Sequence, residues 1–524
     1  MENAEISFSL QAIAGELDYS KVRHLLNRCT FGTKKGEVDS LTGKNISPVL
    51  DTLFQSLPVP QPPVSYDEND LEVTPGQTWV NTAHNSNYNA YRLRSLRSWW
   101  IGLMMKQEIS LVEKMTLFWH NHVVTEAEVV NHATFMYQYN QLLRKYALGN
   151  IKQLVADMTI NPAMLIYLNG ESNKASAPNE NFGRELFELF TIGKGPLIAD
   201  GNYTTYTETD IREAAKVLTG WKVSRSKSTV NFETTRHDKT TKNFTGAFDK
   251  ASIQNREEEE YKLLIDMIFS RKETARYITR KIYRWFVYYK IDATIEQQII
   301  EPLATTLFDN GYEIKPMLRQ LLGSEHFFSA GFLGSQIKNP LDFTIGVYRK
   351  CEINPAPQLL TNYKQWNEVF YQSRNMEMAP NDPPDVAGWP QYYKEPSYYQ
   401  LWVNSSTVPL RTGFTDKLCG SGLTMDNFKF VIDPFSMTTK VSNPGDVGIL
   451  INGFAQILLP VALTGAQLQH LREVLIPGLP DGTWTYEWSK YHANPNDATQ
   501  KSIVAKKLLA LLKAIMRMPE FYLS

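Results

Sequence analysis

The sequence predicts a mainly α-helical protein: a large, multi-helical globular fold with a small β-hairpin or loop excursion and long irregular loops. Apolar residues recur at three-to-four spacing through most of the long segments, which is the helical pattern. The chain has 524 residues, 43% of them hydrophobic, so a substantial buried core is expected. Alternating apolar and polar residues, the pattern of strands, are confined to one short polar stretch.

Six segments carry the helical pattern most clearly, and they are 91–106, 110–123, 131–148, 178–192, 208–218 and 272–289. Thr207 and Asp210 have the spacing of a capping box, and Gly220 is expected to close the helix that follows them. Pro178 suits the first turn of its helix, and Gly193 is expected to end it.

The segments between the helices divide the chain. Residues 56–77 are rich in proline and acidic residues and predict an extended connector or surface arm. Residues 223–248 are polar and threonine-rich, as in a small hairpin or ordered loop. Residues 376–399 and 433–447 are long irregular stretches, which are often functional. We therefore expect an N-terminal helical segment (1–56), a proline-rich connector (57–78), a helical core carrying the site (79–350) and a C-terminal helical and loop region packed on that core (351–524).

Composition excludes several classes of function. Lysine and arginine total 54 and aspartate and glutamate 55, which argues against a nucleic-acid partner. Cys29, Cys351 and Cys419 are scattered without CxxC spacing, so neither a disulfide scaffold nor a thiolate zinc site is expected. No glycine-rich phosphate loop or dinucleotide fingerprint occurs, and no nucleotide cofactor is expected. The GxSxG and HExxH motifs are absent as well.

Localisation follows from two further absences in the sequence pattern. The first 20 residues lack a basic start followed by an apolar run, and no stretch approaches 18 consecutive apolar residues. No membrane span is therefore expected. The cytoplasm is the default location, and the periplasm or export applies if a signal was removed.

The first candidate site is the run Phe118-Trp119-His120-Asn121-His122. Helical phase places His122 on the apolar face, where we expect it to be buried. His120 lies about 200° around the helix, so both imidazoles can bind one ion only if the helix breaks near Asn121. The alternative is that His122 is a hydrogen-bonded core histidine and His120 caps the helix end.

Two further groups of polar residues complete the candidates. One group is a polar helical stripe that consists of Asn181, Arg184, Glu185 and Glu188. Its carboxylates lie three residues apart and could share a cation. The alternative is that the stripe is a solvated helix face with an ion pair between Glu180 and Arg184. His237 and Asp238 lie in the polar excursion, where a carboxylate beside an imidazole can supply metal ligands or a general base.

In chain order these pieces form a longer pattern, which consists of His24-Leu25-Leu26-Asn27-Arg28 with Thr30-Phe31-Gly32, Phe118 to His122, Asn161-Pro162-Ala163-Met164-Leu165 with Tyr167-Leu168, Asn179-Glu180-Asn181 with Arg184-Glu185-Leu186, Leu218-Thr219-Gly220-Trp221, His237-Asp238, and Val386-Ala387-Gly388-Trp389-Pro390. The pattern resembles the bacterial family Domain of Unknown Function 1800 over nearly the whole chain. The resemblance implies a bacterial source and one large helical module, and the family has no generally assigned reaction. Many relatives have histidine where this chain has Phe190, which implies a reduced or altered site if that histidine belongs to it.

The leading hypothesis is a metal-dependent enzyme. We expect His120, His122 and His237 to bind a divalent cation with Glu185 or Asp238, and Glu180 or Glu188 to supply acid–base function beside Arg184. Nitrogen and oxygen ligands favour zinc, iron or manganese, with copper as a further candidate. Hydrolysis is the first expectation, because a bound cation lowers the pKa of water, and a metal-dependent oxidoreductase is the second.

The competing hypothesis is a non-catalytic ligand-binding or scaffold protein. In it the histidines and glutamates form a buried polar network, and aromatic loops bind a glycan or partner. Under either hypothesis the expected partner is a small molecule, a glycan or a peptide.

Overall fold

The helices of the protein begin and end close to where the sequence pattern predicts. A computed structural model describes residues 6–389 and 401–524. The six expected helices are α4 (Asn89–Lys106), α5 (Val112–His122), α7 (Ala133–Lys145), α10 (Glu180–Glu185) continued by the π-helical turn η2 (Leu186–Thr191), α11 (Glu208–Val217) and α13 (Lys272–Phe286). The predicted fold class, mainly α with small hairpins, is confirmed.

Local capping explains these boundaries and corrects two of them. Thr207 and Asp210 form the predicted capping box of α11. Pro178 lies before its helix, because the side chain of Asn179 accepts a hydrogen bond from the amide of Asn181 and makes Asn179 the N-cap. Gly220 lies beyond the end of α11, which Leu218 caps. It has a φ of 99° and lies directly before the hairpin that starts at Trp221. Gly193 ends the η2 turn with a φ of 72°, as expected.

The described chain contains further α-helices and a second π turn. They are α1 (Tyr19–Cys29), α2 (Lys35–Leu41), α3 (Ile46–Leu53), α6 (Ala127–Val130), α8 (Ile151–Thr159), α9 (Pro162–Tyr167), α12 (Glu260–Phe269), α14 (Ala293–Ile295), the π turn η6 (Glu296–Ile300), α15 (Glu301–Asp309), α16 (Ile314–Leu322), α17 (Pro340–Lys350), α18 (Leu359–Asn375), α19 (Thr407–Leu418), α20 (Pro434–Thr438), α21 (Val447–Leu458), α22 (Gly465–Leu475), α23 (Asp481–Ala493) and α24 (Ala498–Met516).

Strands occur only as antiparallel pairs within the described residues. The pairs are β1 (Leu197–Ala199) with β2 (Asn202–Tyr203), β3 (Trp221–Ser224) with β4 (Thr229–Phe232), β5 (Lys242–Asn243) with β6 (Ser252–Ile253), and β7 (Leu423–Met425) with β8 (Phe428–Phe430). In the β3–β4 pair Trp221 lies opposite Phe232. A hairpin was expected in the polar excursion, and β3 and β4 are that hairpin.

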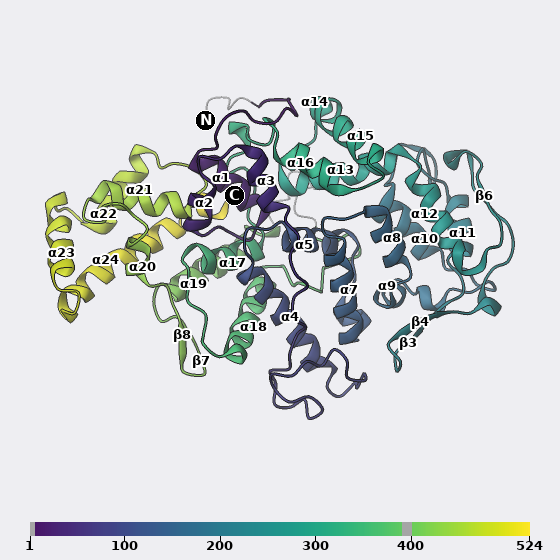
Figure 1. The fold of residues 1–524 in the computed structure, drawn as a ribbon, viewed down its shortest axis with the longest axis horizontal. Helices are drawn as coiled ribbons and strands as arrows, with labels where there is room; N and C mark the ends of the chain where they lie inside the picture. The colour runs from purple at the N-terminus through teal and green to yellow at the C-terminus, as the bar shows by residue number, and fades with distance from the viewer. Residues whose placement is uncertain (1–5, 390–400) are drawn as a thin grey trace.

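The molecule is elongated, with α5 near its middle (Figure 1). Helices α21 to α24 form one end, and α10 to α12 with the strands of the polar excursion lie at the other. Helices α4 and α18 pack together below α5, and α7 packs on both α4 and α5. Helix α5 thus packs directly on α7, which in turn packs on α4 and links α5 with the α4–α18 pair.

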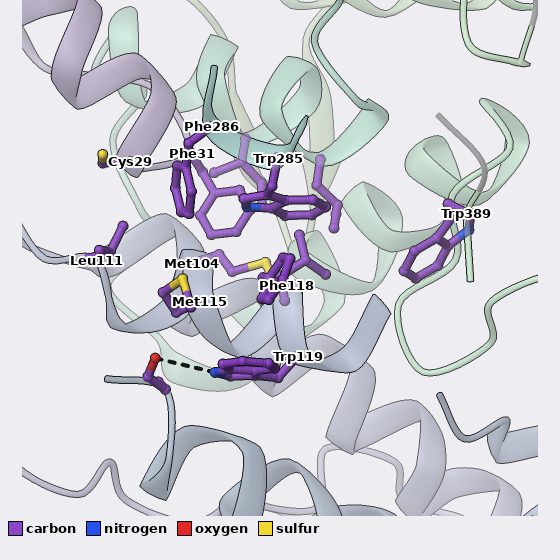
Figure 2. Packing of buried hydrophobic residues seen from close by; sticks show 14 of the residues in the cluster. Cys29, Phe31, Met104, Leu111, Met115, Phe118, Trp119, Trp285, Phe286 and Trp389 are labelled. Carbon is purple, nitrogen blue, oxygen red and sulfur yellow. Dashed lines mark hydrogen bonds between the residues drawn. The ribbon is translucent and has the colours of Figure 1, made fainter. Parts of the chain in front are cut away.

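Buried aromatic rings pack closely around α5 (Figure 2). The ring of Phe118 packs edge-on against Trp285 at 5.6 Å and against its neighbour Trp119 at 4.8 Å between centroids. The buried Trp119 indole donates a hydrogen bond of 3.3 Å to the carbonyl of Ala147. Burial of such large rings is a major source of the stability of this region.

The proline-rich connector is an ordered arm that folds back on α4. The Ser65 amide donates to the Gln77 carbonyl at 2.8 Å, which closes the arm into a loop. Inside the loop the fully buried Asp70 carboxylate is paired with Arg92 of α4 at 2.9 Å. In the part of the chain that the structure covers, no helix has the length and apolar character needed to cross a membrane.

Candidate functional site

Helix α5 is buried on all of its faces, although it carries several polar residues. Every side chain from Glu113 to His122 is buried. Lys114 donates to Asp342 of α17 at 2.5 Å, and Glu113 accepts two hydrogen bonds from Arg144 of α7. Because buried charged groups are costly without partners, these contacts explain how a polar helix sits in the core.

The helix continues without a break through His122, so its two histidines lie on different faces. His122 is buried, as its helical phase predicts. His120 is buried as well, with its ring between Trp100 and Trp389 at centroid distances of 5.3 and 5.8 Å. Its Nε2 accepts a hydrogen bond of 3.1 Å from the amide of Asn381. The lone pair of that nitrogen is therefore used within the protein.

The loop from Asn381 to Trp389 is fastened to the same helix end. The Trp389 amide donates to Oδ1 of Asn121 at 2.7 Å. Gly388 has a φ of 81°, and a Cβ at this position would overlap Asn121. Only glycine permits this close approach of loop and helix. The rest of the irregular stretch that the sequence singled out, residues 390–399, lies outside the described residues.

His122 has one nitrogen without a partner. Its Nε2 lies 3.0 Å from the carbonyl oxygen of Phe190, and since a carbonyl only accepts, Nε2 carries the proton. Burial, together with the charge of Lys281, lowers the pKa of His122 to about 3 despite the bond to Phe190, so the ring is neutral at pH 7. The lone pair is then on Nδ1, which is buried without a hydrogen bond.

The carbonyl that receives this bond belongs to the π turn η2. Such turns are rare and often mark functional sites. The hydroxyl of Thr191 donates to the carbonyl of Leu186 across the turn at 2.5 Å. The hydroxyl of Tyr277 of α13 donates to the carbonyl of Leu189 at 3.1 Å. Phe190 is fully buried in this turn.

Four carboxylates and a tyrosine gather beside the turn. Tyr167 donates to Oε1 of Glu126 at 2.7 Å. Burial raises the pKa of Tyr167, as do Glu126, Asp385 and Glu185, so the hydroxyl stays protonated. Burial also raises the pKa of the half-buried Glu185, and Glu188 and Asp385 raise it further against the opposing charges of nearby cations. We call Glu126, Tyr167, Glu185, Glu188 and Asp385 the acidic cluster.

The other expected catalytic residues are engaged in ion pairs. Arg184 makes two hydrogen bonds of 2.7 Å with Glu208 of α11, and Glu180 lies 4.0 Å from the same guanidinium. Glu188 is paired with Lys194 and accepts a hydrogen bond of 3.1 Å from Tyr206. Glu185 differs from them because its side chain has no hydrogen bond or ion pair with any described residue.

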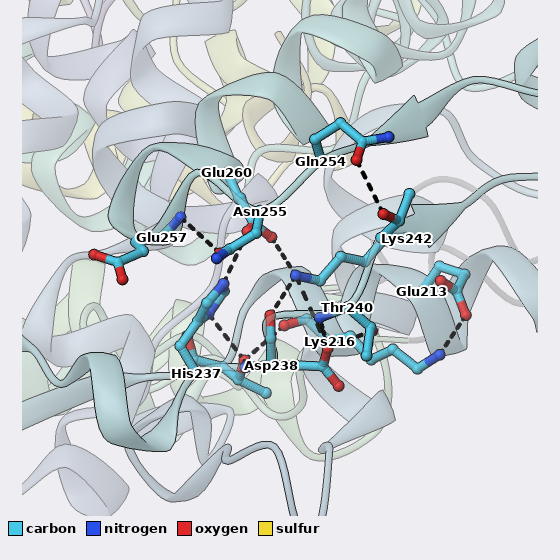
Figure 3. A network of polar contacts seen from close by, with 12 residues as sticks. Glu213, Lys216, His237, Asp238, Thr240, Lys242, Gln254, Asn255, Glu257 and Glu260 are labelled. Atoms are coloured by element: carbon cyan, nitrogen blue, oxygen red, sulfur yellow. Dashed lines mark hydrogen bonds and ion pairs between the residues drawn. The ribbon is translucent and has the colours of Figure 1, made fainter.

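His237 lies in a closed network of charges (Figure 3). Its Nε2 is 2.9 Å from Glu260, which is also paired with Lys242 at 2.6 Å, and all three side chains are fully buried. The Nδ1 atom donates to the carbonyl of Thr219 at 3.0 Å. Burial alone would raise the pKa of Glu260, but His237 and Lys242 outweigh it and lower that pKa.

Asp238, beside His237, faces the polar loop and is partly exposed. It accepts a hydrogen bond of 2.8 Å from the amide of Thr240. Burial tends to raise its pKa, and the bonds from Thr240 with the charge of Lys242 lower it overall. Asp238 thus belongs to the network of Figure 3 and to the turn after it.

The structure brings together two of the three groups of candidate residues. The end of α5 and the segment from Asn179 to Thr191 meet through His122 and the acidic cluster, whereas His237 bonds with Thr219 and Glu260. Within residues 6–389 and 401–524, no three or more His, Cys, Asp or Glu side chains are grouped where they could hold a metal ion.

Sequence reasoning missed several members of these groups. Tyr167 belongs to the motif that follows Asn161, and Asp385 lies in the irregular stretch 376–399, but neither residue had a predicted role. Glu126 follows the 118–122 run by four residues, and no periodic signal distinguishes it. Glu260 ends a run of glutamates, a pattern usually typical of a solvated surface. Lys242 had no signal beyond its position in the polar excursion.

Comparison with protein families agrees with this motif order. The family model described as "Protein of unknown function (DUF1800)" matches residues 24–523. Comparisons with curated proteins and with solved structures find no match. The matched residues include every segment of the candidate site, from α5 through the η2 turn to the loop at Gly388. The chain therefore belongs to the DUF1800 family.

Proposed function

We propose that this protein is an enzyme, and specifically a hydrolase, that uses general acid–base catalysis at the acidic cluster. The observation that carries the proposal is Glu185, a half-buried carboxyl group with a raised pKa and no bonding partner among the described residues. Perturbed carboxyl groups are concentrated at catalytic sites, and a half-buried carboxyl group without a protein partner is open to a substrate.

The cluster contains both partners that hydrolysis requires. One group must take a proton from the attacking water, and another must donate a proton to the leaving group. Glu185, held toward its protonated form by burial and by Glu188, suits the acid. Glu126, oriented by the hydrogen bond from Tyr167, suits the base. Different environments for two carboxylates separate such roles in acid–base enzymes.

The test is hydrolysis of a panel of chromogenic esters, phosphate esters, glycosides and peptide anilides by the purified protein. We expect turnover of one class, a fall in kcat of about 100-fold or more in Glu185→Gln, and a similar fall in Glu126→Gln. Glu128→Gln is the matched control, because Glu128 is an exposed glutamate two residues from Glu126. Turnover that is unchanged in Glu185→Gln, or no turnover of any class, contradicts the proposal.

Metal dependence is a second proposal, and the specific observation behind it is His122. An imidazole whose Nε2 proton is held by a carbonyl, with a free lone pair on Nδ1, has the arrangement typical of metal-ligating histidines. Among the five ligands expected from the sequence, His122 and Glu185 retain unused donor atoms, while His120 and His237 use theirs within the protein.

Metal analysis of protein purified without a histidine tag tests this second proposal. We expect a bound zinc, iron, manganese or copper ion that is lost in His122→Ala and retained in His492→Ala, since His492 is exposed on α23. Substoichiometric metal in every preparation contradicts it. The non-catalytic alternative is supported by the network of His237, Glu260 and Lys242, whose closed arrangement suits a structural role at that position.

A further inference from the structure

A second cavity lies at the opposite end of α5 from the acidic cluster. It is a groove of about 980 Å³ between the proline-rich arm, the end of α4, the start of α5 and the end of α7. Val112 and Glu113 of α5 line it, whereas His122 at the other end of that helix faces the η2 turn. Eleven residues of helix correspond to about 16 Å, so the groove is separate from the acidic cluster.

One wall of the groove is held rigidly. The Trp99 indole donates to the carbonyl of Gln61 at 2.8 Å, and the Gln55 side chain donates to the carbonyl of Ile109 at 3.3 Å. Between these two attachments run Leu57 to Pro60, where two prolines restrict the backbone. Val59 is 80% exposed in this wall. A preorganised wall lowers the entropy lost when a ligand binds.

A buried amide without partners lies beneath the surface of the groove. Gln107 is only 7% exposed, and neither its Nε2 nor its Oε1 has a hydrogen bond. Nε2 of Gln141, which lines the same groove, is also buried and unpaired. An unpaired buried polar atom is costly, so a ligand that supplies both an acceptor and a donor relieves this cost.

The chemistry of the lining selects among ligands. Leu57, Val59, Leu103, Val112 and Leu148 provide apolar surface. None of the described lining residues is aromatic, so the flat faces on which sugar rings could pack are not offered here.

The charges at the rim are mixed. Lys106 and Lys315 lie there with Glu108 and Glu313, so the groove complements a chain that carries both signs better than a polyanion or a polycation. A peptide has this combination of apolar side chains, charges of either sign and an amide at every residue.

We infer that this groove is a binding site for an extended peptide segment, whose backbone amide pairs with Gln107. In this arrangement the side chains of Gln107 and Gln141, whose amide atoms are covered in the free protein, turn toward the groove. The peptide carbonyl then accepts from Nε2 of Gln107, the peptide N–H donates to its Oε1, and Gln141 donates to a neighbouring carbonyl. The peptide side chains lie against the arm between Leu57 and Pro60. This site does not depend on catalysis at the acidic cluster.

The experiment is saturation-transfer NMR with a pool of randomised N-acetyl tetrapeptide amides, followed by titration of the strongest binder. We expect binding to the wild-type chain, a loss of affinity of about tenfold in Gln107→Leu, and a loss in Val59→Arg, which places a charge on the exposed wall. Gln469→Leu is the matched control, because Gln469 is a glutamine of α22 outside the groove. It should bind like the wild type.

Folding is checked separately by urea unfolding. Gln107→Leu removes an unpaired amide, so its free energy of unfolding should be no lower than that of the wild type. Binding of cellotetraose or chitotetraose in place of the peptides, absence of peptide binding, or full affinity in Gln107→Leu would overturn the inference.

Discussion

Replacement of Gly388 by alanine tests how the loop from Asn381 to Trp389 is held against α5. The residue has a φ of 81°, and a left-handed conformation costs a residue other than glycine about 1–2 kcal/mol. The new Cβ would also overlap both the side chain and the carbonyl of Asn121, so the loop must move. Movement breaks the 2.7 Å bond from the Trp389 amide to Asn121, worth about 1 kcal/mol.

Partial exposure of Trp389, which is 1% exposed in the folded chain, adds about 1–2 kcal/mol. We therefore expect Gly388→Ala to lower the free energy of unfolding by about 3–5 kcal/mol. Equilibrium unfolding in urea followed by tryptophan fluorescence measures this loss. Gly413→Ala is the control: this glycine lies inside α19, its Cβ would meet nothing within 4 Å, and alanine there should stabilise by about 0.5–1 kcal/mol. Equal unfolding midpoints for Gly388→Ala and the wild type would refute the reasoning.

Three further changes probe the charges of the molecule. Glu260→Gln leaves a buried lysine and imidazole without their carboxylate and should destabilise by about 3–5 kcal/mol in urea, whereas Glu259→Gln on the exposed turn before it should change stability by less than 0.5 kcal/mol. Burial lowers the pKa of His120 and His122 from 6.5 to about 3, so below pH 6.5 the unfolded chain takes up protons that the folded chain does not. The free energy of unfolding should therefore fall between pH 6.5 and pH 3. A flat pH profile of that free energy would contradict the burial of the two neutral rings. Glu185 has a raised pKa, so its ionisation destabilises the folded chain at pH 7. Glu185→Gln should therefore raise the melting temperature at pH 7, and this gain should vanish below pH 4.5. A lower melting temperature of the variant at pH 7 would argue against a destabilising carboxylate.

Helices and caps could be predicted because their causes are local. The capping box of Thr207 and Asp210 lies within four residues, and the apolar face of α5 is a matter of helical phase, which correctly turns His122 inward. The same phase analysis places His120 on the opposite face. It could not predict that His120 is also buried, because the loop that covers it, at Asn381, lies 261 residues away.

The candidate site shows the same limit. The sequence grouped His120, His122 and His237 because all three are imidazoles in polar motifs. The structure gives each ring its own environment: Asn381 for His120, Phe190 for His122 and Glu260 for His237. These partners are separated from the histidines by tens to hundreds of residues, and neither spacing nor composition encodes such contacts.

The polar residues of the motifs differ in whether they have hydrogen-bond partners within the protein. Those that have partners serve packing, and those without partners are available for chemistry. A helix that is buried on every face can keep polar residues only if distant segments supply partners, and Asn121 and His120 have theirs in the loop at 381–389. Their identity is then explained by docking alone. The carboxyl of Glu185 and the Nδ1 of His122 are not explained in this way, since each remains without a partner among the described residues where neighbouring polar groups are bonded. Unpaired buried atoms also occur elsewhere in the described chain, as at Gln107 and Tyr348, so a missing partner alone does not mark a site. At His122 the free Nδ1 coincides with the η2 turn and lies on the same side of the molecule as the acidic cluster, and this coincidence is our reason for proposing to seek a substrate there.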